Sequence, residues 1–342
     1  MRFVIKSKLN KEIVHYASDD LVISSRYNKI FIHMNREEEV IQLPGDGWRG
    51  LSGRFRLTRR ASRLDKCNVF LVKEGLVIIR QGLVYHYDLK DKVLKLTLKL
   101  KNCRNILHQA LCQTDEGDLF FGEYGNNPGR EIVLVYRSQD SGLSWQKIYS
   151  FPAGRIKHVH GCYWDPFEKK VWIFTGDFAG ECYAINADPD FRDVEWIGNG
   201  QQVYRLCNAF FEENAIHWIM DSQLEDSYHI KMDRETRLIE KLTLFPGPVW
   251  YIKQLKDGFY LAATAQEIGP GVHDRLSHLM ATRDLVHWED IHQFRHDGLP
   301  KRLFKFGVVG FADGDQTSQG FYIFGEALRG LDGRSILCQI EA

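Results

Sequence analysis

The sequence predicts an all-β protein, a seven-bladed β-propeller, on three observations. Short runs rich in β-branched and aromatic residues recur between turn residues along most of the chain. Hardly any segment carries the 3.6-residue periodicity of an amphipathic helix. From residue 105 onward the runs fall into groups of four that repeat about every 45 to 55 residues, which matches the length of a propeller blade.

The predicted blades follow one another along the chain. Two of them span residues 11–42 and 67–98, with runs such as "KIFIHM" and "GLVIIRQ". The later groups begin near residues 105, 156, 203, 249 and 303. The last group is one strand short, so we expect residues 2–8, "RFVIKSK", to complete it from the other end of the chain. A six-bladed ring is the alternative, because residues 43–66 fit no blade.

Composition limits the classes of function. The chain has 342 residues with 44% hydrophobic content, enough for a large core, and no linker-like stretch divides it. We therefore expect a single propeller domain over residues 1–342. Lys plus Arg equals Asp plus Glu at 45 each, so no overall field draws the protein to a nucleic acid or an anionic membrane. The sequence predicts no nucleic-acid partner, and it makes no prediction of the oligomeric state.

The cellular location of the protein and the redox state of its cysteines are predicted from missing sequence features. The amino-terminal stretch has no apolar run of signal-peptide type, and no later run approaches the roughly 18 apolar residues of a spanning helix. We expect a cytoplasmic protein without a membrane span. The seven cysteines are an odd number without any CxxC, which predicts reduced thiols in the core.

One motif lies on the predicted hairpin between the third and fourth strands of the blade that begins near residue 105. The stretch "YRSQDSGLSWQKI" contains S-x-D-x-G-x-x-W at Ser138, Asp140, Gly142 and Trp145. On a hairpin, the Ser and Asp side chains can hydrogen-bond the turn backbone and the Gly can take a positive φ. The Trp can pack against the blade edge. The motif therefore predicts a structural role.

This spacing resembles the Asp-box, or BNR repeat, of the sialidase-like β-propeller superfamily. A shortened version, "ATRDLVHW" with Asp284 and Trp288, occurs at the corresponding hairpin of a later blade. The stretch from about residue 118 to 268 is similar to BNR-repeat, glycosyl-hydrolase-like proteins of bacterial polysaccharide gene clusters. The resemblance implies the propeller fold and a carbohydrate partner. It implies no particular reaction, since Asp-boxes occur in hydrolases, lyases and binding proteins.

Candidate site residues gather on the rim opposite the motif, because the second turn of each blade and the link between blades share that rim. A carboxylate follows the predicted second strand in five consecutive blades. These residues are Glu123, Asp177, Asp221, Glu267 and Glu326. The first strands are expected to begin on the same rim with His108, His158, His160, Tyr204, Arg205, Tyr251 and Lys305. Titratable groups at one mouth of a channel predict a functional site, with a solvated rim as the alternative.

The predicted chemistry is cleavage of a glycosidic bond in an acidic bacterial saccharide. Two carboxylates suit hydrolysis, whereas a His and Tyr proton-transfer pair with an Arg suits β-elimination, and the sequence leaves both open. The candidate catalytic residues are His108, Glu123, His158, His160, Asp177, Tyr204, Arg205 and Asp221. The candidate substrate-binding residues are Tyr124, Tyr251, Glu267, Lys305 and Glu326.

The sharpest prediction is that His160 pairs with Asp177 and His108 pairs with Glu123 in one titratable cluster. No cofactor is predicted, and a divalent metal at the histidines is the less favoured alternative to hydrogen bonding. A true sialidase is disfavoured, because "FRLT" with Arg56 replaces the family's F-R-I-P motif. A glycan-binding propeller that stacks sugars on aromatic residues such as Trp48, or a protein-interaction scaffold, is the alternative to an enzyme.

Overall fold

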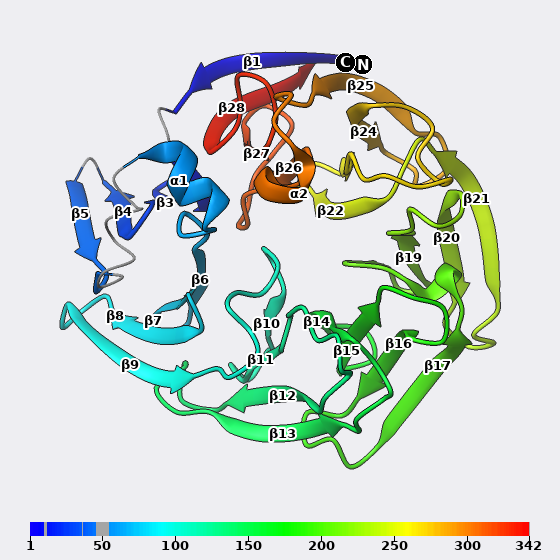
Figure 1. Ribbon diagram of the computed structural model, residues 1–342, viewed down its shortest axis with the longest axis horizontal. Helices are drawn as coiled ribbons and strands as arrows, with labels where there is room; N and C mark the ends of the chain where they lie inside the picture. The colour runs from blue at the N-terminus through cyan, green and yellow to red at the C-terminus, as the bar shows by residue number, and fades with distance from the viewer. Residues whose placement is uncertain (10–11, 36, 46–54, 342) are drawn as a thin grey trace. The chain divides into compact units, whose positions relative to one another are not determined.

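The seven-bladed propeller is confirmed. The structure is a computed structural model that describes residues 1–9, 12–35, 37–45 and 55–341. Within these residues the strands form seven four-stranded antiparallel sheets, each built from strands that are neighbours in sequence except for the last sheet (Figure 1). The six-bladed alternative is wrong.

Most strand bounds agree with the predicted runs, but three sheets begin later than predicted, at residues 111, 210 and 308 instead of near 105, 203 and 303. The sheet that follows β1 (Arg2–Lys8) contains β2 (Ile13–Ala17), β3 (Leu21–Arg26), β4 (Lys29–Met34) and β5 (Glu37–Gln42). The next two sheets contain β6 (Asn68–Val72), β7 (Gly75–Arg80), β8 (Leu83–Asp88) and β9 (Val93–Lys99), then β10 (Leu111–Gln113), β11 (Leu119–Gly122), β12 (Val133–Ser138) and β13 (Gln146–Phe151). Two more contain β14 (His158–Asp165), β15 (Lys170–Gly176), β16 (Cys182–Ala187) and β17 (Val194–Gly200), then β18 (Phe210–Phe211), β19 (Ala215–Ile219), β20 (Ser227–Asp233) and β21 (Ile239–Phe245). The last two contain β22 (Val249–Gln254), β23 (Tyr260–Thr264), β24 (Leu276–Thr282) and β25 (Glu289–Arg295), then β26 (Val308–Phe311), β27 (Phe321–Glu326) and β28 (Arg334–Glu341) with β1.

The chain divides into two compact units. Unit 1 comprises residues 1–69, 251–267 and 274–342, and unit 2 comprises residues 70–250 and 268–273. Unit 2 holds the sheets from β10 to β21 and most of the β6–β9 sheet. The prediction of a single domain over the whole chain stays a prediction.

Strand β1 completes the last sheet, as predicted. It runs antiparallel to β28, with Arg2 opposite Glu341 and Lys8 opposite Ile336, and a bulge lies between Ile5 and Ser7. Figure 1 shows the two strands side by side with the chain ends together. The first strand of the chain is therefore the outer strand of the last blade.

Helical structure explains why residues 43–66 fit no blade. Helix α1 (Arg56–Ala61) occupies part of this segment, and α2 (Lys301–Phe304) precedes β26. Arg60 of α1 is buried, where it contacts the carboxylate of Asp297 and donates to the backbone oxygen of Phe304 at 2.8 Å. No helix in the described part of the chain is long and apolar enough to cross a membrane.

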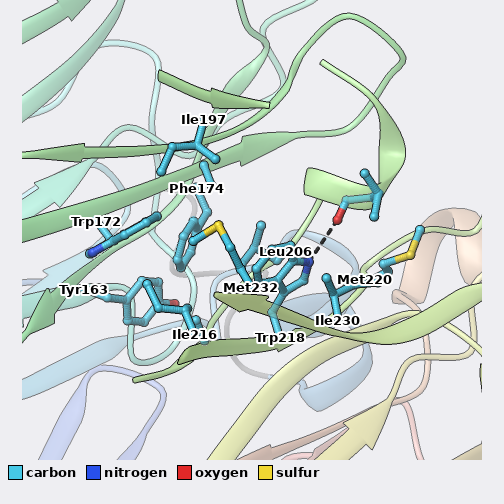
Figure 2. Close-up of a cluster of buried hydrophobic side chains, with 13 residues drawn as sticks. Tyr163, Trp172, Phe174, Ile197, Leu206, Ile216, Trp218, Met220, Ile230 and Met232 are labelled. Carbon is cyan, nitrogen blue, oxygen red and sulfur yellow. Dashed lines mark hydrogen bonds between the residues drawn. The ribbon is translucent and has the colours of Figure 1, made fainter. Parts of the chain in front are cut away.

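The core of unit 2 supports the loop that carries several candidate site residues. Figure 2 shows the buried cluster between the β14–β17 and β18–β21 sheets, with Trp172, Leu206 and Trp218 among its members. The indole N–H of Trp218 donates to the backbone oxygen of Val203 at 2.9 Å. This bond and the full burial of Leu206 hold the 202–208 loop against the core.

The cysteines behave as predicted. All seven lie among the described residues, all are buried, and none forms a disulfide. Burial raises the pKa of the Cys162 thiol well above its usual range, which keeps it protonated.

Candidate functional site

Asp177 is the centre of the candidate site. It directly follows β15, and its carboxylate oxygen Oδ1 lies 3.2 Å from Nε2 of His160 and 3.4 Å from Nε2 of His158. His158 is opposite Gly176 in the sheet, which places Asp177 beside the start of β14. The register shift between Val159 and Gly161 lets both imidazoles reach the same oxygen. The structure thus brings His160 and Asp177 together, as the sequence predicted, and adds His158.

Backbone carbonyls hold the other side of each imidazole. Nδ1 of His158 lies 2.8 Å from the backbone oxygen of Gly125, and Nδ1 of His160 lies 2.8 Å from that of Leu206. A carbonyl only accepts, so each Nδ1 carries the hydrogen and each Nε2 faces Asp177. The Tyr124 ring covers His158 at a centroid distance of 4.3 Å.

Two cations complete what we call the Asp177 cluster: Lys157, His158, His160, Asp177 and Arg205. Nζ of Lys157 lies 2.5 Å from Oδ2 of Asp177, and Nη2 of Arg205 lies 3.5 Å from Oδ1. Nη1 of Arg205 also donates to the backbone oxygen of Asp177 at 3.0 Å. Burial alone would raise the pKa of Asp177, but hydrogen bonds and charge interactions with the two histidines hold it well below its usual range.

Asp221 forms a buried layer behind the cluster. Its Oδ2 accepts a hydrogen bond from the Cys207 thiol at 3.3 Å and lies 3.4 Å from Nε of Arg205. The same oxygen is 4.0 Å from Nδ1 of His160. Burial, reinforced by Asp221, raises the pKa of Cys207 well above its usual range, so the thiol remains a donor. Asp221 balances the charge of Arg205 from a position that solvent does not reach.

Glu123 directly follows β11 and has its own set of partners. Its carboxylate accepts hydrogen bonds from the Tyr136 hydroxyl and the Leu134 backbone N–H, both at 3.2 Å. Burial raises the pKa of Glu123, against the effect of these bonds. Its backbone oxygen accepts from the N–H of Val159 at 2.9 Å, which links its blade to β14. His108 lies buried in the turn before β10 instead of beginning a strand, which corrects its predicted placement, and its predicted pairing with Glu123 stays a prediction.

The prediction that Tyr204 and Arg205 begin a strand is wrong. They end and follow a 3-10 turn, Gln202–Tyr204, and β18 starts only at Phe210. The turn directs the two side chains differently: Arg205 reaches Asp177, whereas the Tyr204 ring packs on the core at a centroid distance of 6.3 Å from Trp218. The Tyr204 ring therefore contributes to the packing of unit 2, and its predicted catalytic role stays a prediction.

The remaining candidates lie in unit 1. Nζ of Lys305 pairs with Oε2 of Glu326 at 2.9 Å, and Lys305 follows α2 instead of beginning a strand, which corrects its predicted placement. Tyr251 of β22 is a buried core residue whose ring lies 6.2 Å from that of Phe324. Glu267 is buried three residues after β23. The substrate-binding roles of these residues stay predictions.

Two residues named in the sequence analysis lie outside the described parts of the chain. They are Trp48 and the side chain of Arg56. Conversely, the structure adds Lys157 and Cys207, which were not predicted. Lys157 immediately precedes the predicted histidine strand, so a search for cations beside that strand would have found it.

The 138–145 hairpin, which joins β12 to β13, has the structural role predicted for it. The Ser138 hydroxyl donates to Oδ1 of Asp140 at 2.8 Å and accepts from the N–H of Gly142 at 2.8 Å. Gly142 has a φ of 95°, a value that favours glycine. The shortened copy repeats the pattern, because Thr282 donates to Oδ1 of Asp284 at 2.9 Å.

Comparisons with known proteins identify the fold and no family. No family model matches the sequence. No curated protein matches it either. Two solved structures are similar to the whole chain in fold. The extracellular domain of a protein from B. thetaiotaomicron, described as a hybrid two-component system, has a TM-score of 0.56 and 11% identity over 98% of this chain. YCF48 bound to D1 peptide has a TM-score of 0.56 and 10% identity over 99% of this chain and 97% of its own.

The extent of these matches limits what they mean. This chain covers 39% of the B. thetaiotaomicron domain, so it corresponds to a part of that protein. At such low identity the similarity concerns the propeller fold alone.

Proposed function

We propose that this chain is a carbohydrate-active propeller that binds an acidic saccharide at the Asp177 cluster and cleaves a glycosidic bond there. The observation that carries the proposal is the carboxylate of Asp177, which meets two imidazoles, a lysine and an arginine. The likeness of the 138–145 hairpin to an Asp-box supports a carbohydrate partner.

Exposure assigns different roles to the members of the cluster. The side chains of Asp177 and Lys157 are 18% and 17% exposed, whereas those of His158 and His160 are 4% and 2% exposed. A ligand would therefore meet the carboxylate and the ammonium, and the imidazoles would position them. Lys157 offers a charge to a uronate carboxylate, and the neighbouring Tyr124 ring offers a face to a sugar.

Hydrolysis fits these residues better than β-elimination. The tyrosine of the residue set that suggested elimination is Tyr204, whose ring packs on the core. Hydrolysis needs an acid for the leaving oxygen and a base for the attacking water. Glu123 is the proposed acid, because burial helps it to keep its proton, and Asp177 is the proposed base, because its lowered pKa keeps it ionised. The two residues follow β11 and β15 of neighbouring sheets.

A glycan array followed by turnover assays on its hits tests this proposal. The wild-type chain should bind acidic glycans. Glu123→Gln should retain binding and lose turnover by about 10²- to 10⁴-fold, the usual effect of losing a general acid. Glu116→Gln is the matched control, because Glu116 is an exposed carboxylate in the turn at the other end of β11. Binding to peptides or nucleic acids without any glycan would contradict the proposal.

A ligand-binding propeller without catalysis is the second candidate. The near-complete burial of both imidazoles favours it, because buried histidines can position a carboxylate without meeting a ligand. The similarity in fold to YCF48, solved with a peptide, makes a peptide the second class of ligand to screen. Binding that survives in Glu123→Gln, with no turnover in the wild type, would select this candidate.

A further inference from the structure

Three electron-pair donors converge within the Asp177 cluster. Nε2 of His158 and Nε2 of His160 both face Oδ1 of Asp177, and one ligand atom from each of these three residues lies within 4.8 Å of the other two. Both Nδ1 atoms donate to backbone carbonyls at 2.8 Å, so in the neutral imidazoles each Nε2 presents a lone pair to the carboxylate oxygen. Nε2 of His158 is buried and has no well-formed hydrogen bond among the described residues. Lone pairs facing one another at this range need a positive charge between them, supplied either by protons on the two Nε2 atoms or by a bound cation.

The spacing of these atoms fits a metal ion. Zinc binds imidazole nitrogen at about 2.0–2.1 Å and carboxylate oxygen at about 2.0–2.2 Å, so ligands at tetrahedral angles lie about 3.3–3.5 Å apart. The observed separations are 3.4 Å from His158 and 3.2 Å from His160 to Oδ1 of Asp177. We propose that His158, His160 and Asp177 bind one divalent transition-metal ion of the zinc and cobalt class, with a fourth position open to water.

The surroundings orient the three ligands as a metal site requires. The carbonyls of Gly125 and Leu206 fix the tautomer and the ring plane of each histidine, as the outer partners of metal-bound imidazoles do. Lys157 holds Oδ2 of Asp177 at 2.5 Å, which leaves Oδ1 for the ion. Both histidines are buried on β14, so little reorganisation is needed on binding.

The nearby charges set the strength of the site. Lys157 and Arg205 repel a bound metal ion, whereas Asp177 and Asp221 attract it. When the imidazoles are neutral, the charges of these four residues cancel. We therefore expect binding weaker than at a site with only anionic neighbours. The ammonium of Lys157 is the closest opposing charge, and its removal should strengthen binding.

The inference concerns ion binding and does not depend on the proposed saccharide. If both proposals hold, an ion held by His158, His160 and Asp177 would lower the pKa of a bound water, and would so replace Asp177 as the group that activates the attacking water. Metal binding is measured without any glycan, so failure of one proposal leaves the other standing.

Titration of the chelator-treated full chain with Co²⁺, followed by visible absorption and calorimetry, tests the inference. The wild type should bind one Co²⁺ per chain and release it to Zn²⁺. His158→Gln and Asp177→Asn should weaken binding by at least about tenfold. The matched control is His273→Gln, which changes a part-exposed histidine paired with Asp226 and should leave binding unchanged.

Lys157→Met keeps the inference falsifiable if the ligand variants unfold. It removes the ammonium and retains all three ligands, so it should tighten Co²⁺ binding by roughly threefold or more. A wild-type chain that binds no ion at one equivalent overturns the inference. So does binding that is unchanged in folded His158→Gln and Asp177→Asn, or weaker in Lys157→Met.

Discussion

Trp145 donates its indole N–H to the hydroxyl of Thr97 at 3.2 Å, and so ties the 138–145 hairpin of one blade to β9 of the preceding blade. Gly142 makes the same connection by close approach, because a Cβ at this position would lie 2.6 Å from Cγ2 of Val77 in β7. The Trp145 ring also packs edge-on against Phe121 at a centroid distance of 4.9 Å. The motif therefore fastens neighbouring blades. It lies at one end of the β11–β12 pair, and Glu123 lies at the other end.

The first prediction concerns this hairpin. Ser138→Ala should lower the free energy of unfolding by about 1–3 kcal/mol, because it leaves the buried N–H of Gly142 without its acceptor. Chemical denaturation measures the change. Ser150→Ala, on the exposed face of β13, should change stability by less than about 0.5 kcal/mol. Equal effects of the two substitutions would contradict the fastening role.

The second prediction concerns a buried ion pair between neighbouring blades. Arg234 contacts both oxygens of Asp165, at 2.5 and 3.0 Å, and Asp165 is fully buried. Arg234→Met should cost about 3–5 kcal/mol of stability, because it leaves a buried carboxylate without its cation. Arg192→Met is the matched control, since that side chain is 81% exposed. A melting temperature lowered no further by Arg234→Met than by the control would refute the prediction.

The third prediction concerns β1. Deletion of residues 1–8 should destabilise the chain strongly, because β28 loses its whole partner strand and becomes an exposed edge. Thermal melting and aggregation measure the effect. Lys6→Ala within β1 removes an exposed side chain without removing the backbone ladder, and should leave the melting temperature nearly unchanged. A deletion variant that melts like the wild type would exclude the role of β1 in closing the sheet.

The fourth prediction concerns pH. Nδ1 of His217 lies 3.0 Å from Nε2 of His229, and burial lowers the pKa of His217 to about 4 and that of His229 to about 3. Lys231 reinforces the shift at His217. Unfolding returns both to about 6.5, so below this pH the unfolded chain binds protons that the folded chain does not. Stability should fall on acidification by up to about 1.4 kcal/mol per pH unit for each histidine.

Denaturant unfolding at about pH 7 and about pH 5 measures this dependence. The loss between these pH values should be smaller in His229→Gln than in the wild type. His287→Gln changes a histidine that is 84% exposed and should keep the wild-type dependence. The same loss in His229→Gln as in the wild type would show that the buried pair does not titrate as described.

The blade repeat was predictable because each strand carries its own local pattern. In β15 the apolar run "VWIF" lies between turn residues, and its pairing with β14 across a short turn needs no information from elsewhere in the chain. The 202–208 loop was not predictable, since "QVYRLCNAFF" has the composition of a strand. Its 3-10 turn depends on the bond from Trp218 to the backbone of Val203, a contact between segments 15 residues apart.

The candidate site divides in the same way. His160 lies in β14 and Asp177 directly follows β15 of the same hairpin, so counting residues from the turn placed them together. Glu123 instead accepts a hydrogen bond from Tyr136 of β12. The pairing of β12 with β13 shifts register between Val135 and Tyr136, and counting residues along the sequence does not reveal such a shift. Arg205 reaches Asp177 from the next blade, and only the packing of blades brings them into contact.

The pairing of β1 with β28 also determines how the last sheet responds to force. The two strands are antiparallel, and the pair formed by Arg2 and Glu341 lies at the open end, beside both chain ends. Tension applied at these ends acts on one backbone hydrogen-bonded pair at a time, so β1 separates from β28 pair by pair. The whole ladder is not loaded in shear at once. The blade that joins β1 to β28 is therefore the first of the described sheets to be loaded when the chain is pulled by its ends.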